Sequence, residues 1–154
     1  MPDPFRGPAA VAASCAAIFL PGSLVFGFSG AMAEHWSQAF DVGKAEIGRI
    51  LFFVLAAVGI FMFLAGHLQR RFGAPRVTAA GAVLYGAGTV LAAGAQNMGW
   101  VYGWAAFIGA SSACIYAPTL TVVQSWYPQR KGLFAGLVGM CFGLSGAIMA
   151  PVYG

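Results

Sequence analysis

Apolar residues fill long, uninterrupted stretches of this chain, and charged residues are confined to the short segments between them. Four stretches contain no Asp, Glu, Lys or Arg: residues 7–33, 50–69, 77–129 and 132–154. A helix needs about 20 mostly apolar residues to cross a bilayer, because the hydrocarbon core is about 30 Å thick and each residue adds about 1.5 Å. The third stretch is long enough for two such helices, with a turn at residues 94–99. We therefore predict an all-α membrane protein with about five transmembrane helices, at about 9–32, 47–68, 77–95, 100–125 and 132–153.

The composition excludes the other broad classes of protein. Hydrophobic residues make up 60% of the chain and charged residues 8%, whereas a soluble domain has roughly 25% charged residues. Disordered chains are poor in apolar residues, and three cysteines exclude a disulfide scaffold. The runs are continuously apolar rather than alternating, which favours helices over barrel strands. The first run is too long for the apolar region of a cleaved signal peptide, and further spans follow it, so we expect it to be retained.

Basic residues lie mostly on one side of the predicted membrane. Six of the eight fall in the amino-terminal tail, between spans two and three, or between spans four and five: Arg6, Arg70, Arg71, Arg76, Arg130 and Lys131. The other side has only Lys44 and Arg49. Because Lys and Arg are retained in the cytoplasm during insertion, we expect a cytoplasmic amino terminus, in a bacterial inner membrane. The net charge of +4 is spread over short loops, so it indicates contact with the lipid bilayer and no nucleic-acid partner.

Tryptophan and tyrosine residues gather at the ends of the predicted spans. One follows span one, three open span four and two close it: Trp36, Trp100, Tyr102, Trp104, Trp126 and Tyr127. Because their amphipathic rings favour the headgroup level, we expect these residues to mark the membrane surfaces.

Span five carries a stripe of small residues. Alternating spacings of four and three place six of them on one helical face: Gly132, Gly136, Gly139, Gly143, Gly146 and Ala150. Little hydrophobic force acts between helices in lipid, so a glycine face favours close backbone contact. Two interpretations remain open. The face is either a static packing surface or one that slides or rocks against a partner helix.

Span four carries a stripe of hydroxyl groups. Ser112, Tyr116 and Thr119 share one face of this span, with Pro118 beside them. Polar groups at bilayer depth usually face the bundle interior or a water-filled cavity, which makes these three residues candidates for a substrate cavity. The alternative is that the serine and threonine hydroxyls bond their own helix backbone. Tyr116 has less scope for this, because a buried tyrosine hydroxyl seeks a partner elsewhere.

Patterns for catalysis and metal binding are weak. Ser29 and Ser145 each lie in a G-x-S-G sequence similar to that of rhomboid-like intramembrane serine proteases. Such a serine needs a histidine base, but no histidine follows Ser145. After Ser29, His35 lies in the expected outer loop and His67 at the inner end of span two, so neither lies at the depth of Ser29. These two histidines, with no carboxylate in any span, make no metal site. We therefore expect no enzyme activity, no metal and no cofactor.

The segment between spans two and three carries a recognisable motif. It reads Gly66-His67-Leu68-Gln69-Arg70-Arg71-Phe72-Gly73-Ala74-Pro75-Arg76. This resembles the G-x-L-x-D-R-x-G-x-x-R loop of the major facilitator superfamily of transporters, which lies at the same place on the cytoplasmic side. Arg70 stands where the family has an aspartate. The resemblance implies a gating loop made by Gly66, Arg70, Arg71, Gly73 and Arg76.

Two further segments are similar to one branch of that superfamily. Residues 109–118 end in Tyr116-Ala117-Pro118, and residues 126–136 place an aromatic pair before a basic turn and an Ala-Gly pair after it. These segments resemble spans four and five of the oxalate/formate antiporters and monocarboxylate transporters, and residues 41–48 resemble the approach to span two. The resemblance implies a fold of twelve helices in two halves, of which residues 1–154 would be a partial amino-terminal bundle.

The function that this resemblance implies is secondary active transport of small organic anions by alternating access. The arginine and lysine that pair with substrate carboxylates in the oxalate/formate group lie in the second half, so the missing carboxy-terminal half of the same transporter is the expected partner. The alternative is a complete five-span membrane protein with a structural or channel role. An intramembrane serine protease is a further, weaker alternative.

Overall fold

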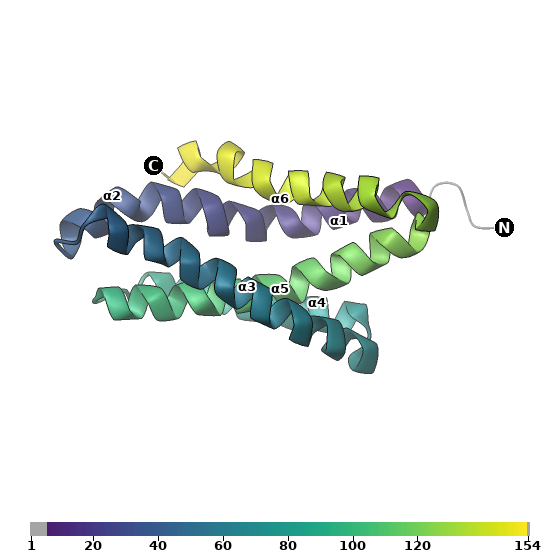
Figure 1. Ribbon diagram of the computed structural model, residues 1–154, viewed down its shortest axis with the longest axis horizontal. Helices are drawn as coiled ribbons and strands as arrows, with labels where there is room; N and C mark the ends of the chain where they lie inside the picture. Colours follow the sequence, from purple (N-terminus) through teal and green to yellow (C-terminus); the bar gives the residue numbers. More distant parts are fainter. Residues whose placement is uncertain (1–5, 154) are drawn as a thin grey trace.

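The computed structural model describes residues 6–153, and every regular element in that range is a helix (Figure 1). Span one consists of α1 (Arg6–Gly22), a π-helical segment η1 (Ser23–Phe28) and α2 (Ser29–Ala39). It is followed by α3 (Lys44–Phe72), α4 (Ala74–Ala92) and α5 (Met98–Trp126). A short 3-10 turn, η2 (Pro128–Arg130), leads into α6 (Lys131–Tyr153). The predicted all-α fold is confirmed.

Within residues 6–153, four helices are long and apolar enough to cross a bilayer: Gly7–Ala39, Lys44–Phe72, Met98–Trp126 and Pro128–Tyr153. The remaining expected span, 77–95, corresponds to α4, which has 19 residues. This helix is shorter than the other four spans and has Arg76 in its first turn, but it is continuous and packs along α5. The chain is therefore a multi-pass integral membrane protein.

Helix continues beyond two of the apolar runs, so the segments between these spans contain less loop than expected. Span one extends through α2, so Glu34 and Trp36 lie in a helix rather than in a loop. The 33 residues of Gly7–Ala39 cover about 50 Å, more than the hydrocarbon core is thick. The predicted loop between spans two and three reduces to Gly73, which lies between α3 and α4 with a φ of 87°. Glycine adopts this left-handed conformation without the strain that a side chain would cause.

The predicted turn between spans three and four is confirmed. α4 ends at Ala92, and α5 begins at Met98. The Asn97 side chain caps α5 by accepting a hydrogen bond from the backbone N–H of Trp100 at 2.8 Å. The Trp100 indole then donates to the Leu91 carbonyl at 3.0 Å, which closes the turn.

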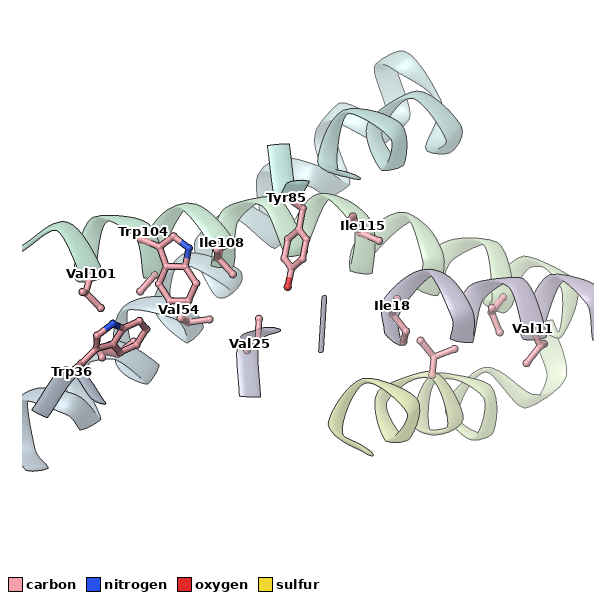
Figure 2. Packing of buried hydrophobic residues seen from close by; sticks show 14 residues of the cluster. Val11, Ile18, Val25, Trp36, Val54, Tyr85, Val101, Trp104, Ile108 and Ile115 are labelled. Carbon is pink, nitrogen blue, oxygen red and sulfur yellow. The ribbon is translucent and has the colours of Figure 1, made fainter. Parts of the chain in front are cut away.

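The helices form two groups (Figure 1). α6 runs parallel to span one and packs along it, while α3 and α4 pack on α5. Buried apolar side chains from both groups meet in one core, in which Val25 of span one faces Val54 of α3 and Ile108 of α5 (Figure 2). Large side chains on the outer faces, such as Phe63 at 86% exposure, point away from the bundle, as expected for surface that lies against lipid.

Candidate functional site

Span one is broken at its middle. Pro21 lies inside the helix, and it has no N–H to donate to the carbonyl one turn earlier. The next residues, Ser23–Phe28, form a π-helix, in which hydrogen bonds reach back five residues rather than four. Ser23 is at the midpoint of the helix Gly7–Ala39, so the break falls near the centre of the bilayer. Such π-helical segments are frequent at functional sites.

A tyrosine of α4 donates to the carbonyl groups at this break. Tyr85 is 5% exposed, and its hydroxyl lies 2.9 Å from the Pro21 carbonyl oxygen and 3.4 Å from that of Leu20. Figure 2 shows its ring pointing from α4 toward span one. The Leu20 carbonyl also accepts a hydrogen bond from Ser23 Oγ at 2.8 Å. Because unpaired carbonyls are costly in the hydrocarbon region, these donors stabilise the broken backbone.

The break is also joined to α6. Ser23 is fully buried, and its Oγ lies 3.0 Å from the Tyr153 Oη. Because Ser23 donates its one hydroxyl hydrogen to the Leu20 carbonyl, Tyr153 is the donor in this pair. Tyr85, Ser23 and Tyr153 therefore form a group of hydroxyls at mid-membrane depth that comes from three different spans. We call it the hydroxyl cluster.

Glycines allow the backbones of span one and α6 to touch at the break. A Cβ at Gly22 would overlap the Phe142 carbonyl oxygen and the Ser145 hydroxyl, and a Cβ at Gly27 would lie 2.9 Å from the Gly146 carbonyl oxygen. A Cβ at Gly146 would in turn lie 2.7 Å from that of Phe26. Close backbone approach of this kind is how membrane helices gain packing contacts. The π-helical segment is therefore fixed on the α6 side by contacts that only glycine permits.

Four aromatic rings pack together beyond the break. The Phe28 ring lies edge-on to the rings of Trp36, Trp104 and Tyr153 at centroid distances of 6.0, 5.7 and 5.7 Å. Trp36 and Trp104 also meet edge-on at 5.7 Å, and Figure 2 shows the pair. We call these four residues the aromatic cluster. Edge-to-face pairs contribute about 0.5–1.5 kcal/mol each beyond area burial, so the cluster holds α2, α5 and α6 together.

Two residues of the predicted aromatic belts belong to the aromatic cluster. Trp36 and Trp104 are each 4% exposed, so their rings pack inside the bundle rather than against lipid. The Trp104 indole N–H donates to the Gly88 carbonyl at 2.9 Å, so this ring needs no water for its polar edge. Trp100, by contrast, is 45% exposed near the start of α5, a position that fits a membrane surface.

The three predicted cavity residues occupy different surroundings on α5. Ser112 and Thr119 are buried, and their hydroxyls donate to carbonyls of their own helix, Gly109 at 2.8 Å and Ile115 at 2.7 Å. Thr119 also borders a cavity of about 430 Å³ between α1, α4 and α5. Ser112 and Thr119 are therefore already paired in this conformation.

Tyr116 differs from these two residues. It is half-buried, and its ring lies edge-on to that of Phe142 of α6 at 5.2 Å. Its Oη lies 3.5 Å from where a Cβ at Gly139 would be. No hydrogen bond within residues 6–153 uses this hydroxyl, which leaves a donor at the junction of α5 and α6.

The predicted gating residues lie at the joint between α3 and α4. Gly66, Arg70 and Arg71 belong to the end of α3, Gly73 is the joint itself, and Arg76 is in the first turn of α4. Both Arg70 and Arg76 are exposed. In the same region the Gln69 amide nitrogen donates to Thr121 Oγ1 at 3.0 Å, which ties the end of α3 to α5.

The predicted glycine stripe of α6 is divided between two surroundings. Gly146 is buried against span one, and Gly139 faces Tyr116. At the other three positions, added Cβ atoms would meet open space within the described chain: Gly132, Gly136 and Gly143. The stripe therefore has two contacts inside this bundle, at Gly139 and Gly146, and three positions that meet no described residue.

Sequence reasoning missed the hydroxyl cluster. The adjacent Pro21 and Gly22 in the middle of an apolar run were a signal for a break in span one. Nothing in the sequence pairs that break with Tyr85, which lies 64 positions from Pro21, or with Tyr153, 130 positions from Ser23.

The chain is similar to known transporters along most of its length. The model of the Major Facilitator Superfamily matches residues 13–154. Over 118 residues the chain is 30% identical to the uncharacterized MFS-type transporter YhjX of Escherichia coli (strain K12), covering 76% of this chain and 28% of that protein. Over 148 residues it is 26% identical to the efflux pump patC of Aspergillus clavatus, covering 91% of this chain and 26% of the pump. The chain spans about a quarter of the length of these curated relatives. With a family model that matches nearly all of it, this chain belongs to the major facilitator superfamily of transporters.

Proposed function

We propose that residues 1–154 form the amino-terminal part of a secondary transporter that moves small organic anions, of the oxalate/formate or monocarboxylate type, by alternating access. Membership of the superfamily is the observation that carries the transport function. The substrate class rests on the resemblance of residues 109–118 and 126–136 to the oxalate/formate and monocarboxylate branch. We place the protein in a bacterial inner membrane with its amino terminus in the cytoplasm, because the basic residues favour that orientation.

The substrate cavity of this proposal lies beside α5. Tyr116 contributes the main contact, because its hydroxyl is the one of the three that bonds no other described residue, while Ser112 and Thr119 donate to their own backbone. A carboxylate loses a large hydration energy on entering a low-dielectric cavity, so it needs donors or a fixed cation in place of water. The described spans carry no Lys or Arg deep in their apolar runs. In this proposal the cation comes from the carboxy-terminal half of the transporter.

Two further features belong to the same proposal. Gly66, Arg70, Arg71, Gly73 and Arg76 form the cytoplasmic gating segment, in keeping with the family motif that they resemble. The exposed part of the glycine stripe, namely Gly132, Gly136 and Gly143, packs against a helix of the carboxy-terminal half, because glycine faces favour close helix contact in lipid.

The test is an exchange assay in liposomes with the full-length protein that contains this chain. We expect saturable exchange of labelled oxalate, formate or lactate, and no uptake by residues 1–154 alone, because alternating access needs two bundles. Tyr116→Phe should raise KM several-fold without changing the amount of folded protein, whereas Thr119→Val should leave KM within twofold. Full-length protein that exchanges none of these anions would refute the substrate class. Saturable uptake by residues 1–154 alone would support a compact five-span oligomer instead.

A further inference from the structure

We propose that Tyr85 is a positioning residue that holds span one in its π-helical form, and that Ser23–Phe28 is a hinge on which α2 turns. The observation behind this is the pair of contacts from the Tyr85 hydroxyl to the Pro21 and Leu20 carbonyls, 2.9 and 3.4 Å away. These carbonyls lie immediately before η1, where the hydrogen-bond pattern changes from four residues to five. A donor from another helix at that point stabilises one pattern over the other.

The inner side of the hinge is held firmly. Gly22 and Gly27 lie against the backbone of α6 around Ser145 and Gly146, with no room for a Cβ. Tyr153 also donates to Ser23 from α6 at 3.0 Å. Gly22 precedes η1 and stays against α6, while Gly27 lies near the far end of η1. A change of helical form in η1 must therefore break the contact of Gly27 with Gly146 and move the part that follows, which is α2.

The outer side of the hinge is held lightly. Trp36 is the one buried residue of α2, and the others in that helix are half-buried or exposed. The ring contacts of Trp36 with Phe28 and Trp104, at 6.0 and 5.7 Å, are the aromatic contacts that fix α2. An element with few buried contacts separates from its neighbours at low cost in free energy. α2 can therefore rotate when the helical form of η1 changes.

The size of the movement follows from helix geometry. A π-helical turn holds about one residue more than an α-helical turn. In an α-helix each residue turns the chain that follows it by about 100° around the helix axis. Conversion of η1 to α-helix would therefore turn α2 by about 100° and carry Trp36 away from Trp104. The aromatic cluster would separate at the outer end of the bundle. The rotation of α2 would be a step in opening the outer side of the transporter, and in this respect the inference rests on the proposed alternating-access function.

The first experiment measures the distance between spin labels on the full-length protein without its native cysteines. Cysteines at Gln38 of α2 and Gln96, in the turn before α5, are both at exposed positions. We expect two distance populations, one of them with the aromatic cluster closed. In Tyr85→Phe the ratio of the two populations should shift threefold to fivefold away from the closed one, which is about the effect of one hydroxyl hydrogen bond. The matched control is Tyr102→Phe, which removes a tyrosine hydrogen bond to the Glu46 carbonyl at 3.1 Å, away from the hinge. An unchanged ratio in Tyr85→Phe, or an equal change in both variants, overturns the proposal.

The second experiment removes the extra residue of the hinge. Deletion of Leu24 from η1 should give a continuous α-helix that keeps α2 in its present orientation, because the π-helical segment holds one additional residue. We expect a folded protein with a single label distance and at least a tenfold lower transport rate. Deletion of Ala56 from the regular helix α3 is the control, and it should prevent folding because it rotates half of that helix by about 100°. If deletion of Leu24 also prevents folding, or leaves two distances, the hinge is refuted.

These outcomes separate the hinge from the proposed substrate class. The label distances are measured without substrate, so a shift in Tyr85→Phe supports the hinge even if the protein exchanges none of the tested anions. Normal exchange of carboxylates with distances that Tyr85→Phe does not change refutes the hinge and leaves the proposed function standing.

Discussion

Gly109 provides a direct test of how α3 and α5 are held together. A methyl group at this position would overlap the carbonyl oxygen of Val54 and would lie 3.0 Å from the Cβ of Ala57. Both neighbours belong to α3, and the first of them is backbone, which cannot move aside as the end of a flexible side chain can. Gly109→Ala must therefore separate the two helices or distort one of them.

The matched control lies six positions earlier on the same helix. Gly103 has no atom within 4 Å of an added Cβ. Gly103→Ala should gain about 0.5–1 kcal/mol of stability, because alanine favours helix over glycine by that amount. Gly109→Ala has the same gain but also forces extra volume into a packed contact, which typically costs about 1–3 kcal/mol. We expect the Gly109→Ala protein to be less stable than the Gly103→Ala protein by about 1–3 kcal/mol.

The measurement is the unfolding of the full-length protein in detergent, followed for wild type and the two variants under the same conditions. The expected order of unfolding midpoints is Gly103→Ala highest, then wild type, then Gly109→Ala. If Gly109→Ala unfolds at or above the midpoint of Gly103→Ala, the backbone contact between α5 and α3 is not as close as the structure has it, and the explanation by overlap fails.

Three further predictions concern orientation, the glycine stripe and the cap of α5. In protein without native cysteines, an impermeant thiol reagent applied to intact cells should label Gln96→Cys but not Gln129→Cys. Both positions are exposed, but the basic residues are expected to keep position 129 in the cytoplasm. The reverse labelling pattern would show that the topology is inverted. Gly146→Leu should lower the unfolding midpoint because its site is filled by Phe26. Gly143→Leu should reduce transport, because the added side chain would block the contact proposed with the carboxy-terminal half. Full transport in Gly143→Leu would refute that contact. Asn97→Ala should cost about 1 kcal/mol in unfolding free energy, because it removes the side-chain oxygen that accepts from the Trp100 N–H. An unchanged midpoint would show that another acceptor or water takes its place.

The helices could be predicted because hydropathy alone places a segment in lipid. Each long charge-free run became helix, and the turn at Asn97 was visible from its polar and glycine residues. Helix ends were less predictable because they do not coincide with the edge of the apolar run. Residues such as Glu34 and Gln38 form helix equally well beyond the hydrocarbon core, so α2 continues to Ala39. At Gly73 a single left-handed residue was enough to separate two helices, where a loop was expected.

The sequence predicted that helices would pack closely at glycines, but not which residues would meet there. The spacing of the α6 glycines showed that close packing was possible there, but the neighbour of each glycine decides whether it occurs. Gly146 meets Phe26 and Gly27, while Gly143 meets nothing within the described chain. The hydroxyls of Ser112 and Thr119 were open to two interpretations for the same reason, because the sequence does not show whether a polar group will bond its own helix or a partner.

The contacts within each of the two groups of helices differ from the contacts between the groups. Within each group of helices, glycines bring backbones together: Gly22 with α6 on one side, and Gly109 with α3 on the other. Between the groups, side chains make contacts instead, such as the Tyr85 hydroxyl with the Pro21 carbonyl and the Trp104 ring with the Phe28 ring. Backbone contacts are rigid, because any shift along them costs steric overlap, while rings and hydroxyls can separate and find other partners. We therefore expect the two groups of helices to separate more readily than the helices within each group, and Tyr85 is a hydrogen-bonding side chain between the two groups.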